Sequence, residues 1–136
     1  MKLLMFYVHE WWYRTAAKSL EDVPDVRKEE SVADAAVIFF HVEAEDEARG
    51  EGVLRKFLKN TKWLAGKFGT RTVVLHSFNH LGTSKSSPEF ARSLVQQAEE
   101  RLTGAGYTVV RTPFGYFNEF RMHVAGDSLA KVFKEF

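Results

Sequence analysis

Two short stretches of the chain are continuously apolar, residues 3–8 (Leu-Leu-Met-Phe-Tyr-Val) and residues 35–42 (Ala-Ala-Val-Ile-Phe-Phe-His-Val). Unbroken apolar runs of this length are typical of central strands that are covered on both faces. The aromatic residues at positions 11–13 are predicted to begin a second strand, and the polar residues 21–31 are predicted to form a connection. Further strands are predicted at residues 72–76, 107–111 and 116–124.

Residues 51–68 carry apolar side chains at helical spacing. The apolar stripe runs from Leu54 to Phe68, and the basic residues between them fall mostly on another face. The pattern predicts an amphipathic helix with a basic outer side, ended by Gly66 and Gly69.

A second helix is predicted to start at the tripeptide Ser87-Pro88-Glu89. Serine caps free N–H groups, proline lacks an N–H that would stay unpaired in the first turn, and glutamate faces the positive end of the helix dipole. Residues 127–136 are predicted to form a short terminal helix.

The order of elements between residues 35 and 111 is strand, helix, strand, helix, strand. Such crossover connections are right-handed and place parallel strands side by side. The predicted fold class is therefore α/β or mixed α+β, with a central mixed sheet and crossover helices. A chain of 136 residues fits one domain of ordinary size, so residues 1–136 are expected to form a single domain.

The composition is that of a globular protein, with 45% hydrophobic and 27% charged residues. No apolar run reaches the roughly 18 residues that a membrane span needs, so no membrane association is expected. No small-residue cleavage site follows the first apolar run, which we interpret as a strand of a cytoplasmic protein. The absence of cysteine excludes disulfides, thiolate nucleophiles and zinc sites built on sulfur.

The net charge of +1 conceals two oppositely charged halves. Residues 1–51 contain 6 Lys or Arg against 12 Asp or Glu, whereas residues 52–136 contain 13 against 6. No acidic residue lies between Glu51 and Glu89, a stretch with seven basic residues. A polyanion is therefore predicted to dock on that side of the protein.

Ligands of open α/β sheets bind beyond the carboxyl ends of the parallel strands. Here those ends carry His41, residues 76–80 and residues 113–118, so these polar and aromatic segments are expected to meet at one edge. His9 and Glu10 would join them if the first strand were also parallel.

The sequence lacks the residue patterns of three common kinds of site, namely a metal site, a phosphate loop and a serine hydrolase. Its histidines have no carboxylate or cysteine partner at ligand spacing, so no metal is expected there. The run from Gly82 to Ser87 lacks the first glycine of a phosphate loop, and its serines lack the Gly-x-Ser-x-Gly turn of a hydrolase nucleophile. We therefore expect neither a metal nor a cofactor.

Two motifs of this edge carry a resemblance to a known family. Phe78-Asn79-His80-Leu81 and Pro113-Phe114-Gly115-Tyr116-Phe117-Asn118-Glu119-Phe120 resemble the editing domain of archaeal-type threonyl-tRNA synthetase, and the resemblance covers nearly the whole chain. It implies a D-aminoacyl-tRNA deacylase-like fold, a homodimer, and hydrolysis of serine wrongly attached to threonine tRNA. The domain would be either free-standing, beside a separate threonyl-tRNA synthetase catalytic subunit, or a piece of a longer synthetase.

The resemblance also implies roles for individual residues. The expected catalytic residues are His80, Tyr116, Phe117 and Asn118. The expected contacts to the aminoacyl group are Phe78, Asn79, His80, Gly115, Tyr116 and His41. Phosphates of the threonine tRNA are expected to meet Arg55, Lys56, Lys59 and Lys62.

The chain departs from the family motif at two positions, where Phe117 and Asn118 stand in place of a tyrosine and a lysine. A phenolic hydroxyl and a cation are therefore not carried over from the motif. Because the sequence offers no protein base with a partner, the 2′-hydroxyl of the terminal adenosine is expected to assist the attacking water.

Three other functions compete with editing. A D-aminoacyl-tRNA deacylase of related fold would cleave D-aminoacyl esters and spare L-seryl-tRNA. A non-catalytic tRNA-binding module would leave every ester intact. A small-molecule-binding α/β domain would need no basic helix.

Overall fold

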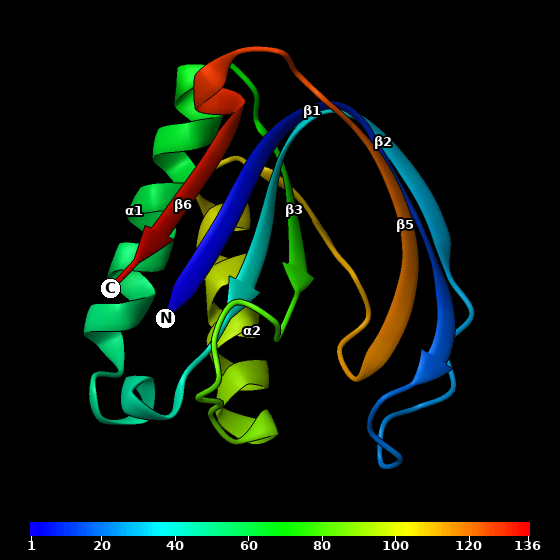
Figure 1. The fold of residues 1–136 in the computed structure, drawn as a ribbon, viewed down its shortest axis with the longest axis vertical. Coiled ribbons are helices and arrows are strands. Elements are labelled where there is room, and N and C mark those ends of the chain that lie inside the picture. Colours follow the sequence, from blue (N-terminus) through cyan, green and yellow to red (C-terminus); the bar gives the residue numbers. More distant parts are fainter.

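The computed structural model describes residues 1–136 and contains one six-stranded sheet and two long helices (Figure 1). The strands are β1 (Lys2–Lys18), β2 (Glu29–His41), β3 (Thr72–Ser77), β4 (Thr108–Arg111), β5 (Tyr116–Val124) and β6 (Lys131–Glu135). The helices are α1 (Glu51–Lys67) and α2 (Pro88–Gly104), and short 3-10 turns lie at Ala44–Ala48 and Ser128–Ala130.

The strands β2, β3 and β4 are parallel neighbours, and α1 and α2 are the crossovers between them. The sheet order is β4-β3-β2-β1-β5, with β1 antiparallel to both β2 and β5. Both crossover connections predicted from the sequence are therefore confirmed, and the sheet is mixed. Ser87 caps α2 as predicted, because its hydroxyl accepts from the Phe90 N–H at 3.2 Å.

β1 is a single strand of 17 residues, so the prediction that a second strand begins at Trp11 is wrong. Its register against β5 shifts between Val8 and Glu10 and again between Thr15 and Ala17. Bulges of this kind bend a strand and increase its twist. The half of β1 before the first bulge pairs with β6, and the half beyond it pairs with β5. β2 likewise starts earlier than predicted, inside the expected connection.

The C-terminal segment is a strand, so the predicted helix over residues 127–136 is wrong. β5 covers one edge of β1 only from Val8 onward, which leaves the backbone groups of residues 2–6 open on that side. Residues 131–135 pair with residues 2–6 in antiparallel register and satisfy these groups. A helix would leave this edge unpaired, and isolated helices shorter than about 12–15 residues are marginal in water.

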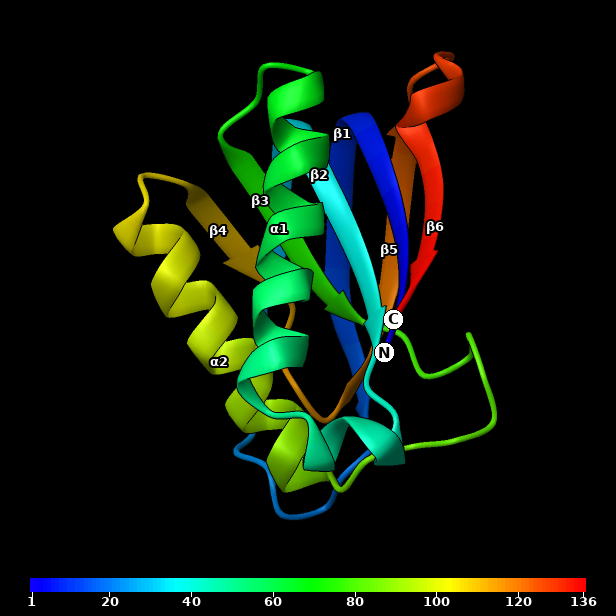
Figure 2. The same ribbon diagram turned by 90° about the vertical axis from the view of Figure 1, so that its left-hand side faces the viewer.

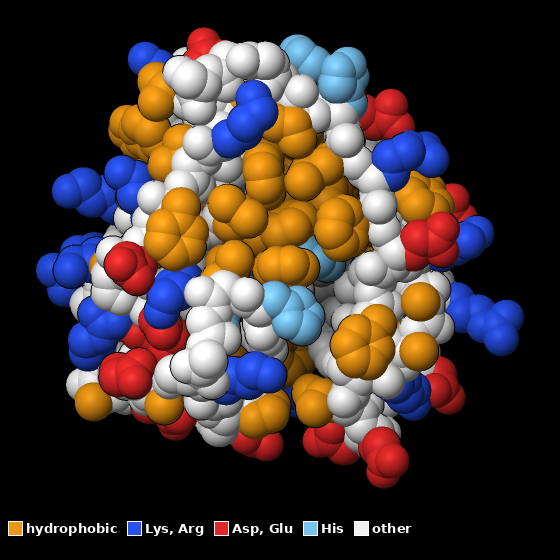
Figure 3. Space-filling model, in the orientation of Figure 1, with side chains coloured by type: hydrophobic (Ala, Val, Ile, Leu, Met, Phe, Trp, Pro, Cys, Tyr) orange, Lys and Arg blue, Asp and Glu red, His pale blue; other side chains and the backbone are white.

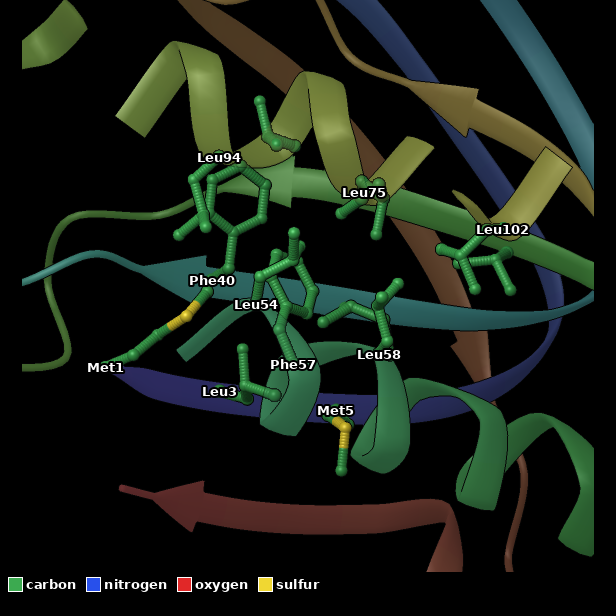
Figure 4. Packing of buried hydrophobic residues seen from close by; sticks show 14 of the residues in the cluster. Met1, Leu3, Met5, Phe40, Leu54, Phe57, Leu58, Leu75, Leu94 and Leu102 are labelled. Atoms are coloured by element: carbon green, nitrogen blue, oxygen red, sulfur yellow. The ribbon is translucent and has the colours of Figure 1, made fainter. Parts of the chain in front are cut away.

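Both long helices cover the same face of the sheet (Figure 2). Their apolar stripes pack on inward residues of β1, β2 and β3, and Figure 4 shows Phe57 of α1 beside Leu3 of β1. The ring centroid of Phe57 lies 5.7 Å from that of Phe40 on β2. Each fully buried side chain of this size contributes about 1.5–3 kcal/mol to stability, so this layer supplies most of the core. Neither helix has the length and hydropathy of a membrane span.

No helix covers the opposite face, although the apolar runs of β1 and β2 predicted cover on both faces. The bend of β1 instead turns β5 across this face, so that Phe120 lies with its ring centroid 5.4 Å from that of Phe39 and 5.3 Å from that of Trp11. The curled sheet therefore shields its own second cluster of apolar side chains. Hydrophobic side chains gather in the centre of this face (Figure 3).

The α-amino group of Met1 is buried beside Asp46 at one end of the sheet. Asp46 accepts from this ammonium at 2.9 Å and from the Glu43 N–H at 2.7 Å, and it also contacts the Arg49 guanidinium. Glu43 forms a second ion pair with the ammonium at 2.9 Å. Burial alone would raise the pKa of Glu43, but hydrogen bonds from Lys2 and the ammonium hold it below its usual value. These contacts hold β1 to the turn that follows β2.

Replacing Asp46 with alanine should lower the free energy of unfolding by about 3 kcal/mol, because the buried ammonium loses a charged partner. Urea unfolding followed by circular dichroism measures this change. The control is Asp25→Ala, whose carboxylate is 95% exposed and whose removal should change stability by less than about 0.5 kcal/mol. An unchanged midpoint for Asp46→Ala would show that the network does not stabilise the fold.

Candidate active site at the ends of β3 and β5

A cavity of about 540 Å³ opens where the end of β3 and the start of β5 approach the first turn of α2. Every residue expected at the aminoacyl ester lines this cavity except His41. The lining residues of the first motif are Phe78, Asn79 and His80, and those of the second are Gly115, Tyr116, Phe117 and Asn118. The structure therefore brings the two motifs together at one site.

His41 lies behind the cavity and not in its lining. Its side chain is fully buried, its Nδ1 accepts from the Leu81 N–H at 3.1 Å, and its Nε2 lies 2.6 Å from the Ser84 carbonyl oxygen. Because Nδ1 accepts, Nε2 carries the proton and donates to Ser84. Both nitrogens are thus engaged with the loop after β3. His41 therefore positions the loop that carries His80 and does not itself line the cavity.

Gly115 adopts a left-handed backbone conformation at φ +80°, which disfavours any other residue. A Cβ at this position would also lie 2.6 Å from a methyl carbon of Val23. The Gly115 carbonyl oxygen accepts from the N–H groups of Ser19 and Leu20 at 2.7 and 3.2 Å. The connection between β1 and β2 therefore packs directly against the second motif and fixes its backbone.

The hydroxyl of Tyr116 is occupied by the same connection. It donates to the Pro24 carbonyl oxygen at 2.7 Å and accepts from the Val26 N–H at 2.7 Å. With both bonds made, this oxygen has little capacity left for a ligand. Tyr116 therefore contributes its ring and its backbone to the cavity wall.

Phe117 and Asn118, the next two residues of the motif, differ in how much of their side chains is exposed. Phe117 is 62% exposed at the rim of the cavity. Asn118 donates from Nδ2 to the Tyr116 carbonyl oxygen at 3.3 Å, and its buried Oδ1 has no hydrogen-bond partner. A neutral amide cannot act as a base near neutral pH, so Asn118 is not expected to take a proton from water.

His76 also lines the cavity, although the sequence reasoning did not assign it a contact. Its Nδ1 lies 3.0 Å from the Thr112 hydroxyl, and its ring packs among Trp11, Phe39 and Phe120. Burial lowers the pKa of His76 to about 4, so its imidazole is neutral at neutral pH. Within an apolar strand such a histidine has no distinguishing local pattern, and only its packing reveals it.

The first turn of α2 supplies a further wall that the sequence reasoning did not place at the site. Pro88 and Ala91 of α2 border the cavity, together with the cap residue Ser87 and the two residues before it, Lys85 and Ser86. The positive end of the helix dipole consequently faces this space and favours negative charge in it. The cap at Ser87 was visible in the sequence, but its closeness to the two motifs depends on the crossover.

Two other expected groups lie away from the cavity. His9 and Glu10 sit beside β5, where the ring centroids of His9 and His123 are 5.0 Å apart, because β1 is antiparallel to its neighbours. The basic side chains of α1 line neither this cavity nor its rim, and cations gather on the side of the molecule where α1 lies (Figure 3). No group of three or more His, Cys, Asp or Glu side chains is arranged to hold a metal ion.

The family model that matches this chain describes the Archaea-specific editing domain of threonyl-tRNA synthetase, and it matches residues 1–136. The chain belongs to this family. Membership supports proofreading of mischarged tRNA, interaction with tRNA and a place in translation.

Curated relatives agree with the family. The chain is 28% identical to the threonine–tRNA ligase of Hyperthermus butylicus over 100% of its own length, and 29% identical to that of Methanosphaera stadtmanae over 97%. It spans only 23% and 22% of those two proteins. The match therefore concerns the editing domain and less than a quarter of a ligase.

A solved structure, the c-Myc DNA unwinding element binding protein, matches 99% of this chain with a TM-score of 0.67. The match covers 98% of that chain at 14% sequence identity, so it bears on the fold alone. The predicted fold class, a mixed sheet with crossover helices of D-aminoacyl-tRNA deacylase-like type, is confirmed.

The buried His76 should make stability fall between about pH 6.5 and pH 4. The unfolded chain binds a proton with the ordinary histidine pKa of 6.5, whereas the folded chain resists it until about pH 4. The contribution of His76 to the free energy of unfolding is therefore fully present above pH 6.5 and is smaller by about 2 kcal/mol at pH 5. Urea unfolding at pH 7 and pH 5 measures the loss.

His76→Gln serves as the comparison, because glutamine keeps a polar side chain and does not titrate. Its loss of stability between pH 7 and pH 5 should be smaller than that of the wild type by about 2 kcal/mol. Equal losses in the two proteins would contradict a buried, neutral His76.

Proposed function

We propose that this domain hydrolyses the ester of L-serine wrongly attached to threonine tRNA and releases serine and free tRNA. The observation that carries the proposal is the cavity that joins residues 78–80 to residues 115–118 in a member of the editing-domain family. Its volume of about 540 Å³ lies within the range of about 300–1,000 Å³ typical of small-ligand sites.

The selectivity follows from a difference of one methyl group. A synthetic site that binds threonine discriminates against serine by only about 1–3 kcal/mol, so errors accumulate. An editing cavity reverses the comparison, because serine fits it and the extra methyl of threonine collides with its wall. Gly115, Ser87 and Pro88 are walls of this kind, since none of them has a long side chain that can swing away.

The seryl group is held by cavity residues whose polar atoms form no hydrogen bond within the protein. The His80 ring forms no hydrogen bond within the protein and packs edge-on against Phe78, with ring centroids 5.0 Å apart. Its nitrogens contact the seryl hydroxyl or amine. Backbone groups of residues 78–80 and 116–118 orient the ester and polarise its carbonyl, and the end of the α2 dipole favours the developing oxyanion.

The attacking water is activated by the substrate, because in this proposal His80 holds the seryl group and the neighbouring side chains are poor bases. The Tyr116 hydroxyl is engaged on both sides, Asn118 is a neutral amide, and the low pKa of His76 makes it a weak base. With His80 assigned to the seryl hydroxyl or amine, the 2′-hydroxyl of the terminal adenosine is the group that assists the water. In this mechanism the protein positions the reactants and the tRNA supplies the hydroxyl. The reaction needs no metal and no cofactor.

The partners follow from the same proposal. The exposed basic face of α1, formed by Arg55, Lys56, Lys59 and Lys62, meets phosphates of the threonine tRNA. The domain pairs as a homodimer, which would cover exposed aromatic side chains such as Phe133 at 48% and the open edge of β6. As a free-standing protein it would work beside a separate threonyl-tRNA synthetase catalytic subunit in the cytoplasm.

The purified protein should cleave L-seryl ester at least about tenfold faster than L-threonyl ester on the same threonine tRNA, because a methyl group accounts for 10–200-fold discrimination. Release of labelled amino acid, measured with EDTA present, gives both rates. His80→Ala should slow the seryl reaction by about tenfold or more. Equal rates on both esters would contradict editing, and cleavage of D-aminoacyl esters alone would assign a D-aminoacyl-tRNA deacylase.

Two reagents separate the roles of protein and tRNA in activating the water. Asn118→Ala should keep the seryl rate within about tenfold, a barrier change of at most about 1.4 kcal/mol, because this side chain only shapes the wall. A substrate charged on the 3′-hydroxyl and lacking the 2′-hydroxyl should react far more slowly with the wild-type protein. An inactive Asn118→Ala variant with an unaffected 2′-deoxy substrate would make Asn118 catalytic instead.

A further inference from the structure

A second hollow lies next to the active-site cavity. It has a volume of about 880 Å³ and lies between the end of β1 and residues 25–29, which lead into β2. Its cations are Arg14, Lys18, Arg27 and Lys28, and its carboxylates are Asp25 and Glu29. We call this hollow the basic groove, since cations outnumber carboxylates in its lining.

Tyr116 is the wall between the basic groove and the active-site cavity, because its side chain lines both. Its hydroxyl is tied at 2.7 Å to Pro24 and Val26, so the wall is fixed to the segment that carries Arg27. Phe117, the next residue, is exposed at the rim of the cavity. A polymer whose last unit enters the cavity can therefore continue past this rim into the groove.

The cations of the basic groove are available to an external anion. The Arg27 side chain is exposed and forms no salt bridge. Lys18 pairs with Asp25 at 2.5 Å, but that carboxylate is 95% exposed. The pair of Lys28 with Glu30 is also partly exposed. Arg14 pairs with Glu119 at 2.8 Å, and both of these side chains are about half exposed. Exposed pairs of this type add little to stability, so a phosphate can replace any of these carboxylates.

We propose that the basic groove binds phosphates of the single-stranded 3′ end of the tRNA while the terminal adenosine and its ester occupy the cavity. This inference rests on the proposed function and adds the path of the RNA into the site. Single strands are bound by cations that follow the backbone and by aromatic rings that stack on bases, and the exposed Phe117 supplies such a ring. The basic face of α1 borders neither hollow, which leaves it to the duplex stem.

The test measures affinity for two uncharged RNA hairpins that carry the acceptor-stem sequence of threonine tRNA. One hairpin is blunt, and the other bears the single-stranded 3′ end. Arg27→Ala/Lys28→Ala removes two cations from the groove. Lys59→Ala/Lys62→Ala removes two cations from α1 and is matched to it in charge. Dissociation constants at several salt concentrations are measured for each protein with each hairpin.

The groove variant should bind the tailed hairpin about tenfold more weakly than the wild type, with a salt slope lower by about 0.7 for each lost phosphate contact. Its affinity for the blunt hairpin should not change, whereas the α1 variant should bind both hairpins more weakly by the same factor. A groove variant that binds both hairpins as the wild type does, or weakens on both equally, would overturn the proposal. Because these RNAs carry no ester, the outcome is independent of whether seryl ester is the substrate.

Discussion

The bend of β1 between Val8 and Glu10 is the constraint on which the rest of the fold depends. A strand of 17 residues must have its backbone groups paired along both edges, and β2 pairs with one edge over most of its length. Because of the bend, the other edge is divided between β6 and β5. The bend also turns β5 across the apolar face that no helix covers. It thereby brings the start of β5 to the end of β3, where the cavity forms.

The cavity is shaped by residues that stand behind it. His41 holds the loop after β3 through both of its ring nitrogens, and Val23 packs where a side chain at position 115 would have to be. A site fixed in this way needs little rearrangement when its substrate arrives, which is the condition under which orientation alone accelerates a reaction. It also explains why a motif that lacks the family's tyrosine and lysine can keep its backbone geometry. The site therefore keeps the backbone positions of the motif although two of its reactive side chains are replaced.

The sequence predicts an element correctly where the pattern that determines the element lies within one segment of the chain. The helical spacing of residues 51–67 and the cap at Ser87 determine α1 and the start of α2 without reference to the rest of the chain. The strand β6 depends on pairing with residues more than 120 positions away, and the unbroken course of β1 depends on pairing with β2, β5 and β6, so no local pattern contains them. The order of strands and helices predicted that both motifs lie at one edge of the sheet. This prediction is reliable because crossover connections between parallel strands are right-handed, so the ends of the parallel strands meet at the same edge.

The sequence predicts which edge of the sheet carries the site better than it predicts which side chains face the cavity. His41 and His76 both lie in buried strands, and the sequence does not distinguish a histidine that faces a cavity from one that supports a loop. The register places both on the same face of the sheet, since His76 pairs with Phe39 and His41 lies two residues further along β2, so the loop that covers His41 is what distinguishes them. The basic groove was also absent from the sequence interpretation, because its cations are interspersed with acidic residues in the half of the chain that is negative overall.

Trp11 packs behind His76, a residue of the cavity lining, with its ring centroid 5.5 Å from that of His76, and its indole N–H is buried without a hydrogen-bond partner. An indole in such dry surroundings emits at short wavelength, and a protonated imidazole beside it quenches the emission. The domain therefore contains its own optical reporter. Entry of water or of a ligand into the cavity, and the charging of His76, would both register in the tryptophan spectrum of the unlabelled protein, above a background from Trp12 and the 42% exposed Trp63.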